Sequence, residues 1–331
     1  MCAFLGQTGP MRGSYREKIE YTAAQMYYGE NRTMQYIARE LEISRSTVSR
    51  LLAEARDQGI VRISLHPPTD RPSALEHRIA EQHGITVHVA HTGGRKVAPQ
   101  DAVARLAAGV IDAMVEPETV IGAAWGATMT SVAEHLRDRH VPGVQVVQLN
   151  GSVNSQPVAA EATGTGLGMG VVERFAEAYG GRPHLFAVPA IFDYEQTKQL
   201  LWRERSTSRV LNLQRRTSLA VFGVGAFADG RPSQVYADGY LSRAARTQLA
   251  EEEVGGDVCT VFRRGDGSWR TIELNSRCSG MRPDELIRIP RRVCVVNGPH
   301  KVAALRGVLA AGLVTDLVLD QASANLLAHG G

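Results

Sequence analysis

Residues 37–52 read IARELEISRSTVSRLL, two segments with apolar residues at helical spacing on either side of a short turn at Glu42-Ile43. Thr33 precedes the first segment and Ser44 precedes the second, and both are residue types that cap helix N-termini. A further helical stretch, residues 16–28, ends at Gly29. The pattern therefore predicts three helices in close succession within residues 12–62.

Each predicted helix has one apolar face, and the third also has a distinct polar one. The apolar faces are Ile19, Ala23, Met26 and Tyr27; Met34, Ile37, Ala38 and Leu41; and Val48, Leu51, Leu52 and Ala55. An apolar face that holds helices together, with arginine and small hydroxyl residues opposite, is what a helix-turn-helix presents to the major groove of DNA. The residues predicted to face DNA are Thr33, Ser44, Arg45, Ser46, Thr47, Ser49 and Arg50.

We interpret residues 12–66 as a helix-turn-helix DNA-binding domain, in which the alternating segment 60–65 could add a small wing. The alternative is an ordinary three-helix piece with a solvated arginine face. Net charge does not choose between them, because 37 Lys and Arg against 34 Asp and Glu give only +3. The local placement of charge favours DNA binding. Residues 44–56 contain three arginines, Arg45, Arg50 and Arg56, and a single acidic residue, Glu54.

Length and composition indicate a chain of two domains. With 331 residues, 44% hydrophobic and 21% charged, it has ordinary globular composition, and no apolar run is long enough to span a membrane. The N-terminus lacks the basic region and apolar core of a secretory signal, so we expect a cytoplasmic protein without a membrane partner. Cys2, Cys259, Cys278 and Cys294 and the ten histidines show no metal-ligand spacing, so no metal, disulfide or cofactor is expected.

Beyond a linker at residues 67–72, the pattern changes to alternating helices and short apolar strands, which predicts an α/β domain over residues 73–329. Helices are expected between most strands, for example at residues 102–115, 170–179 and 301–311. A β-hairpin is expected from strands 258–262 and 269–274 with a turn at residues 263–267. The strands are predicted at residues 86–90, 119–123, 145–149, 184–188, 219–224, 293–296 and 316–319.

Two features of this domain suit a small anionic ligand. A glycine-rich turn, residues 122–128, leads from a strand into a helix, where backbone N–H groups and the helix dipole attract anions and Thr128 adds a hydroxyl. Such turns also occur in α/β folds without any ligand. Lys301 follows a strand end, where open α/β sheets place ligands, although an isolated lysine there is slightly more often a surface charge. No nucleophile motif is present around Ser152 or Ser155.

Taken together, the chain from about Tyr15 to Leu327 resembles the SorC family of sugar-responsive bacterial transcription regulators. The resemblance rests on the order and spacing of several short motifs. It departs from the family pattern at Ser152, at Pro189-Ala190-Ile191 and at Asn297-Gly298. The motifs are residues 37–52 with Ala55-Arg56 and Gly59-Ile60-Val61, Gly122-x-x-Trp125-Gly126-x-Thr128, Gln148-Leu149-Asn150-Gly151, Gly223-Val224-Gly225, Gly256-Asp257, Asn275-x-Arg277 and the tail from Lys301 to Leu327.

The resemblance implies an effector domain related in fold to sugar-phosphate isomerases and deaminases, without catalysis. Trp125, Gly126, Ala127 and Thr128 would hold a phosphate or cap a sugar, Asp257 would accept hydrogen bonds from sugar hydroxyls, and Lys301 would meet the anionic or carbonyl end. Asn150 and Cys259 would form further walls of the pocket. The partners so implied are an operator in double-stranded DNA and a sugar, polyol or sugar phosphate, bound by a homodimer or homotetramer.

The leading hypothesis is a transcription regulator, not an enzyme, whose operator affinity is controlled by a small carbohydrate, expected to be a phosphorylated sugar. One alternative is a sugar-phosphate isomerase or deaminase with an accessory helical domain, in which Asp257 and Lys301 would serve as acid and base. Another is a constitutive DNA-binding protein with a vestigial pocket. Ligand-induced stabilisation and sugar-phosphate turnover distinguish the three.

Overall fold

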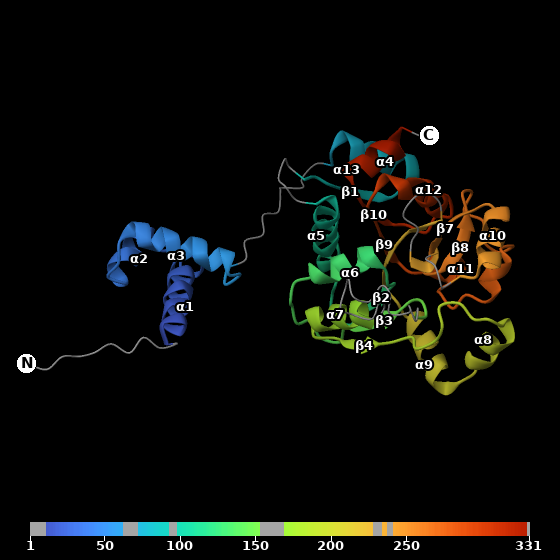
Figure 1. Cartoon of the computed structure of the whole chain (residues 1–331), viewed down its shortest axis with the longest axis horizontal. Coiled ribbons are helices and arrows are strands. Elements are labelled where there is room, and N and C mark those ends of the chain that lie inside the picture. Colours follow the sequence, from blue (N-terminus) through green and yellow to red (C-terminus); the bar gives the residue numbers. More distant parts are fainter. Residues whose placement is uncertain are drawn as a thin grey trace, which may run out of the picture. The chain divides into compact units, whose positions relative to one another are not determined.

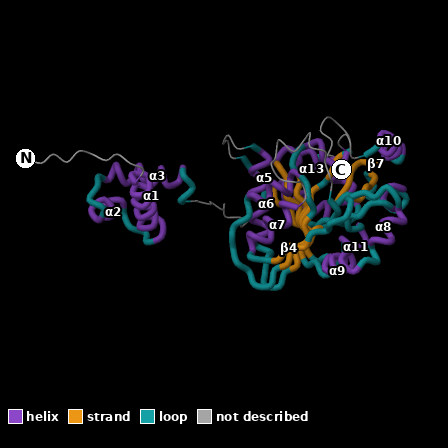
Figure 2. Tube along the Cα trace, turned by 60° about the horizontal axis from the view of Figure 1, so that its bottom comes forward, coloured by secondary structure: helices purple, strands orange, loops and turns teal. Residues whose placement is uncertain are grey.

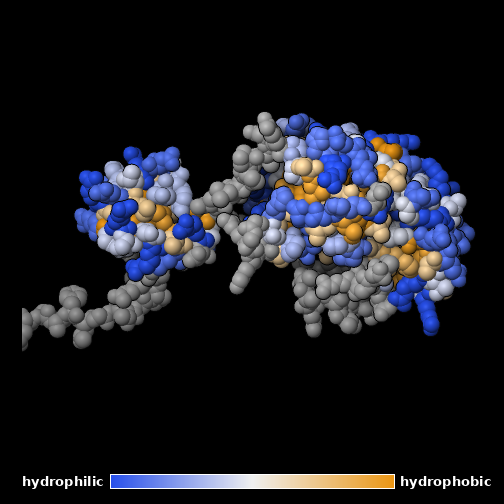
Figure 3. Space-filling view, turned by 90° about the horizontal axis from the view of Figure 1, so that it is seen from above, coloured by the Kyte–Doolittle hydropathy of each residue, from blue (hydrophilic) through white to orange (hydrophobic). Residues whose placement is uncertain are grey.

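The computed structural model describes residues 11–61, 72–92, 98–152, 169–227, 234–236 and 241–329. The chain divides into two compact units, Met1–Asp70 and Arg71–Gly331, and each is described by itself. No helix in the described ranges is long and apolar enough to cross a membrane. In both units hydrophilic residues cover most of the visible face, with apolar residues showing between them (Figure 3).

The first unit consists of helices, and the second alternates strands and helices (Figure 1). The helical unit contains α1 (Met11–Ala24), the π-helical turn η1 (Gln25–Gly29), α2 (Met34–Glu40) and α3 (Arg45–Asp57). The larger unit contains α4 (Ala74–His83), β1 (Thr86–Ala90), α5 (Pro99–Asp112), β2 (Val120–Ala123), α6 (Ala127–Glu134), β3 (Gln145–Gln148), α7 (Met169–Tyr179), β4 (Arg182–His184), α8 (Glu195–Leu201), α9 (Arg205–Gln214), β5 (Leu219–Gly223), β6 (Gly225–Ala226), η3 (Gln234–Tyr236), α10 (Arg243–Glu251), β7 (Val254–Val258), β8 (Val261–Arg264), η4 (Glu273–Ser276), α11 (Pro283–Leu286), β9 (Arg291–Val296), η5 (Pro299–Lys301), α12 (Val302–Ala310), β10 (Asp316–Asp320) and α13 (Gln321–Ala328).

The three predicted N-terminal helices are confirmed, and so are both predicted caps. The Thr33 hydroxyl accepts from the backbone N–H of Tyr36, and the Ser44 hydroxyl accepts from that of Thr47. The wing expected at residues 60–65 extends into residues that lie outside the described ranges. The helices enclose a small core of Ala23, Ala24, Met26, Ile37, Val48, Leu51, Leu52 and Ala55, all of them buried.

The larger unit is built on a seven-stranded sheet of order β1-β10-β9-β5-β2-β3-β4, in which every neighbouring pair is parallel. Figure 2 shows its strands gathered between helices. Helices α5, α6 and α7 pack on one face, and α4, α12 and α13 pack on the other. A smaller antiparallel sheet, β6-β7-β8, joins the second of these layers.

Alternate residues of the central strands enter the two apolar layers. On β9, Val293 and Val295 face the α5–α7 layer, whereas Cys294 and Val296 face the α12–α13 layer. Strands buried on both faces read as continuous apolar runs, which is why they are visible in the sequence. The predicted strands at residues 86–90, 119–123, 145–149, 219–224, 293–296 and 316–319 correspond to β1, β2, β3, β5, β9 and β10.

The order of the strands reverses between β2 and β5. From β2 the chain moves outward through β3 to β4, then returns to place β5 on the other side of β2 and continues outward through β9 to β10. At such a reversal the loops that follow the two central strands diverge, and they leave a crevice at the carboxyl ends of the strands. The loops after β2 and β5 therefore lie at the position where open α/β sheets commonly accept ligands.

Two sequence predictions for this unit are wrong. The hairpin consists of β7 and β8, and its turn is Cys259-Thr260, both at positive φ (51° and 61°), instead of residues 263–267. Residues 269–274 form no strand, because residues 269–272 are irregular or in a turn and residues 273–274 begin η4. The strand expected at residues 184–188 is β4, Arg182–His184, because the chain beyond it bonds to the loop after β3 through Ser152 and Val188.

The first strand, β1, lies at one edge of the sheet, and a single carboxylate meets it there. Glu76, in the first turn of α4, accepts from the backbone N–H of Ser73 through Oε2 at 2.7 Å, which closes the capping box of that helix. Its other oxygen accepts from the backbone N–H of Val89 at 2.7 Å. Helix α4 is thereby fixed to the edge strand.

Gly280 lies against the hairpin turn so closely that a Cβ on it would stand 1.6 Å from the carbonyl oxygen of Cys259. Gly280→Ala must displace backbone, so we expect it to lower the free energy of unfolding by about 1–3 kcal/mol or more. Gly265→Ala is the matched control, because nothing lies within 4 Å of a Cβ there, and should stay within about 0.5 kcal/mol of wild type. Urea unfolding measures both, and equal effects would contradict the close packing of this turn.

Candidate DNA-binding face and effector pocket

The beginning of α3 carries the residues predicted to face DNA. The Ser44 hydroxyl lies 2.7 Å from the Ser46 hydroxyl and 2.8 Å from that of Thr47. Ser44 also accepts from the Thr47 backbone N–H at 3.1 Å, and Thr33 caps α2 in the same manner. Thr33 and Ser44 are therefore occupied in capping, which fixes the start of each helix.

The remaining polar residues of the third helix point away from the core of the unit. Arg45, Ser46, Ser49 and Arg50 are exposed, and Thr47 is half-buried. A helix with exposed arginines and hydroxyls on its N-terminal half has the donors and acceptors that read base edges. The structure thus places Thr33 at the start of α2 and the other six predicted residues at the N-cap and in the N-terminal half of α3.

An arginine–tyrosine pair that sequence reasoning missed lies beside this face. The Arg32 guanidinium stands 5.1 Å from the centre of the Tyr36 ring and makes an ion pair with Glu30 at 3.4 Å. Both side chains of the stacked pair are exposed at the start of α2. Their i,i+4 spacing is the sequence signal that could have identified them.

In the larger unit, the loop after β2 has an extended glycine conformation. Gly126, the N-cap of α6, has φ 145° and ψ 160°, and a Cβ on it would meet nothing within 4 Å. The backbone conformation therefore requires glycine, although space does not. Ala127 is exposed and Thr128 is half-buried, with its Cβ near Gly223 at the end of β5.

A chain of buried hydrogen bonds connects this loop to Asp257. The backbone N–H of Trp125 donates to Oδ1 of Asn150 at 3.4 Å, and Nδ2 of Asn150 donates to the Thr260 hydroxyl at 3.2 Å. The backbone N–H of Thr260 then donates to Oδ2 of Asp257 at 3.1 Å. Residues from the ends of β2 and β3 and from the hairpin turn are thereby held together at the crevice.

The Trp125 side chain forms a wall of the site. Its indole Nε1 donates to the carbonyl oxygen of Gly151 at 2.6 Å, so this N–H is not available to a ligand. The backbone N–H of Gly151 in turn donates to the Ser279 hydroxyl at 3.1 Å, and that hydroxyl donates to the carbonyl oxygen of Ala190 at 3.0 Å. Ser279 thus anchors the loop after β3.

Asp257 is buried and Lys301 is half-buried. Burial raises the pKa of Asp257, opposed by Tyr236, Thr260, Arg263 and Lys301. Burial lowers the pKa of Lys301, opposed by the charge of Asp257. The backbone N–H of Lys301 donates to the carbonyl oxygen of Gly298 at 3.1 Å, and its ammonium has no hydrogen bond or ion pair with the residues that the structure describes.

A glycine and an aspartate shape the loop that carries Lys301. Gly298 has φ 103°, and its backbone N–H donates to Oδ2 of Asp320 at 2.7 Å. Asp320 also caps α13 through the backbone N–H of Ser323. The departure from the family pattern at Asn297-Gly298 therefore keeps the glycine that this conformation needs.

Two further buried side chains near Asp257 were not identified from sequence. Arg263, expected in the hairpin turn, lies on β8 and is 1% exposed, and Tyr236 is 2% exposed. Burial lowers the pKa of Arg263 to about 10. Cys259 lies in the apolar layer beside α12, and burial raises the pKa of its thiol.

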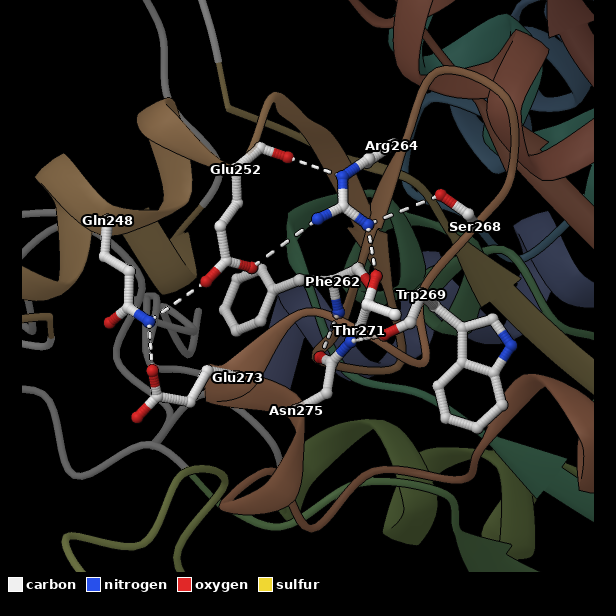
Figure 4. Close-up of polar contacts among 9 residues, drawn as sticks. All are labelled: Gln248, Glu252, Phe262, Arg264, Ser268, Trp269, Thr271, Glu273 and Asn275. Atoms are coloured by element: carbon white, nitrogen blue, oxygen red, sulfur yellow. Dashed lines mark hydrogen bonds and ion pairs between the residues drawn. The ribbon is translucent and has the colours of Figure 1, made fainter.

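The motif residue Asn275 has a structural role (Figure 4). Its Nδ2 donates to the carbonyl oxygens of Phe262 and Trp269, and its Oδ1 accepts from the backbone N–H of Phe262. Beside it, Arg264 donates to the carbonyl oxygen of Glu252 at 2.7 Å and to the Thr271 hydroxyl at 2.9 Å. These bonds fix the loop that follows β8. No group of His, Cys, Asp and Glu within the described ranges has the arrangement of a metal site.

Comparison with known proteins covers both units. Residues 68–328 match the family model described as "Putative sugar-binding domain", and residues 22–71 match the MarR family model. The chain is 28% identical over 316 residues to the deoxyribonucleoside regulator of Bacillus subtilis, covering 95% of this chain and 98% of that protein. It is 26% identical to the sorbitol operon regulator of Klebsiella pneumoniae, covering 92% and 95%.

Solved structures show the same architecture. A domain of a possible sugar-binding transcriptional regulator from Arthrobacter aurescens TC1 is 44% identical, with a TM-score of 0.70, and the match covers 80% of this chain and 99% of that domain. The full-length sorbitol operon regulator SorC from Klebsiella pneumoniae is 22% identical with a TM-score of 0.75, over 94% and 98% of the two chains. The second likeness concerns the fold alone.

The raised pKa of Asp257 predicts a pH-dependent effect on stability. Because the folded protein retains this proton to higher pH than the unfolded chain, the group favours folding below about pH 4 and loses that contribution as pH rises towards its folded pKa. Asp257→Asn removes the ionisation. The free energy of unfolding of the variant relative to wild type should therefore increase as pH rises from about 4 to 7.

Urea unfolding at several pH values measures this difference. Asp193→Asn, at an exposed position, is the matched control. A variant that lost stability relative to wild type as pH rose would contradict the placement of Asp257 as a buried carboxylate without a direct ion pair.

Proposed function

We propose a function for this chain from the premise that it belongs to the SorC family of transcription regulators, as its sugar-binding domain and its relatives establish. It is a DNA-binding regulator with a carbohydrate-binding domain and not an enzyme, because the relatives that cover nearly its whole length are regulators. What remains to be proposed is how it reads DNA, what it binds and how it assembles.

For the DNA-binding unit we propose that α3 enters the major groove. Arg45 and Arg50 would donate to base edges, Ser46, Thr47 and Ser49 would bond bases or phosphates, and the capped starts of α2 and α3 would meet the phosphate backbone. Two such helices reading a partly palindromic operator require a homodimer or homotetramer. With this role, the protein would act on DNA in the cytoplasm.

For the larger unit, the observation that carries the proposal is the hydrogen-bonded chain from Trp125 through Asn150 and Thr260 to Asp257, at the reversal point of the sheet. The effector is a small carbohydrate, in our proposal a phosphorylated sugar. Its phosphate would lie at Gly126, Ala127 and Thr128, where the start of α6 offers backbone N–H groups.

The other end of the sugar would lie towards Asp257 and Lys301, with Cys259 behind them. The ends of β2 and β9 are two strand spacings apart, roughly 10 Å, a span that one sugar phosphate can bridge. An effector that touches several loops at once favours one arrangement of the pocket. Its binding can therefore shift the assembly between states that differ in affinity for the operator.

Replacing Arg45 and Arg50 by alanine should weaken operator binding by about tenfold or more for each arginine that reads a base. The operator is first selected from a random duplex library by the wild-type protein, and affinities are then measured by fluorescence anisotropy at one fixed salt concentration. Arg203→Ala with Arg243→Ala, two exposed arginines of the larger unit, is the matched control. Unchanged affinity in the Arg45 and Arg50 variant would exclude this reading face.

Thermal unfolding against a panel of sugars, polyols and their phosphates tests the effector. A bound ligand at 100 times its Kd should stabilise the protein by about 2.7 kcal/mol. We expect a phosphosugar to stabilise the wild type, and Lys301→Ala to remove most of the shift, because the ammonium would meet the anionic or carbonyl end. Lys18→Ala, in the helical unit, is the control and should leave the ligand-induced shift unchanged. Stabilisation only by unphosphorylated polyols would contradict the phosphate site, and no stabilisation at all would indicate a vestigial pocket.

A further inference from the structure

The connection between η1 and α2 holds an acidic residue and an arginine next to each other. The backbone N–H of Glu30 donates to the carbonyl oxygen of Gln25 at 3.0 Å, and that of Arg32 donates to the carbonyl oxygen of Met26 at 2.9 Å. Between them, Asn31 has φ 53°, a left-handed conformation that asparagine tolerates. The backbone of the helical unit therefore sets the positions of Glu30 and Arg32.

Two partners hold the side chain of Arg32. Its guanidinium lies over the Tyr36 ring, 5.1 Å from the ring centre, and its Nε donates to Oε2 of Glu30 at 3.4 Å. The side chains of Arg32 and Glu30 are half-exposed, and Tyr36 is exposed. No hydrogen bond joins Nη1 or Nη2 of Arg32 to the residues that the structure describes. The aromatic ring thus supports a guanidinium whose terminal nitrogens face solvent.

The position of this pair at the start of α2 indicates what it meets. In a helix-turn-helix the second helix enters the major groove, and the helix before it crosses the phosphate backbone. Arg32 precedes α2, and Tyr36 lies in its first turn, exposed beside the buried Ile37. With α3 in the groove, as proposed above, the anion nearest to the Arg32 guanidinium is a phosphate of the DNA.

The Glu30 carboxylate and a DNA phosphate would compete for this guanidinium. Both are anions that accept hydrogen bonds from an arginine, and the phosphate offers oxygens to both terminal nitrogens. An exposed ion pair at 3.4 Å is weak, so a phosphate can displace it. The displaced carboxylate still lies close by, where its charge repels the phosphate. Every duplex carries phosphates, so this competition does not depend on base sequence.

We propose that Arg32, supported by the Tyr36 ring, binds a phosphate of the DNA backbone, and that Glu30 competes with this phosphate and thereby lowers the affinity of the protein for every duplex. The inference rests on the proposed function of α3 and adds to it a backbone contact with its own internal competitor. Glu30 then sets the overall strength of DNA binding, whereas Arg45 and Arg50 set the choice of site.

Fluorescence anisotropy with the selected operator and with a shuffled duplex of the same length, each over a range of salt concentrations, tests the phosphate contact. Arg32→Gln should weaken binding to both duplexes by the same factor and reduce the slope of log affinity against log salt by about one. Lys18→Gln, at an exposed position of α1, removes the same charge and should leave the slope unchanged. Tyr36→Leu should weaken binding but keep the slope, because it removes the support and not the charge.

A double-mutant cycle tests the competition. Glu30→Gln should raise the affinity for both duplexes by about two- to fivefold, because it removes the competing carboxylate. Glu40→Gln, at an exposed position of α2, is the matched control for the general effect of removing a negative charge. In an Arg32→Gln background the gain from Glu30→Gln should fall to that from Glu40→Gln, since the competition requires the guanidinium.

Two results would overturn the inference while the proposed function stands: wild-type affinity and salt slope in Arg32→Gln, or an equal gain from Glu30→Gln in both backgrounds, with operator binding still lost in the Arg45 and Arg50 variant. If the wild type selects no operator, the proposed function fails and this inference fails with it. Thermal unfolding followed by circular dichroism checks the fold of each variant. All should unfold at the wild-type temperature, because the substituted side chains are exposed or half-exposed.

Discussion

The buried amide of Asn150 is the interaction on which the geometry of the pocket depends. It accepts from the loop after β2 and donates to the turn between β7 and β8, while its own backbone continues from β3. Thr260, the recipient, orients Asp257 in turn. Because these groups are removed from water, breaking one bond would leave its partner unsatisfied, so these bonds couple the three loops energetically. A ligand that contacts any one of them acts on the whole group.

Much of the architecture was predictable because it follows from local periodicity. Thr33 and Ser44 cap helices as their residue types and positions indicate, and the strands with continuous apolar runs are those buried on both faces. Gly126 and Lys301 could be selected because they follow strand ends, where an open parallel sheet accepts ligands. Which residues lie opposite them across the crevice depends on strand order, which no local pattern reports.

The hairpin shows what sequence reasoning could not reach. Turns with two left-handed residues are usually indicated by asparagine and glycine, yet here Cys259 and Thr260 adopt this conformation, with Thr260 bonded to Asp257. Arg263, predicted in the turn, therefore lies on β8 in the interior. Burial of an arginine is rare. The neighbouring Arg264 lies in a polar network, and two adjacent arginines give no sequence signal that says which of them, Arg263 or Arg264, is buried.

Glu76 has a consequence beyond the closing of α4. A strand at the edge of a sheet presents unpaired backbone groups that can recruit a strand from another molecule. By occupying the N–H of Val89, this carboxylate removes one of those groups from β1, and its charge opposes the approach of a second backbone. The same side chain that closes the capping box of α4 therefore also makes the edge strand a poorer template for a strand from another molecule.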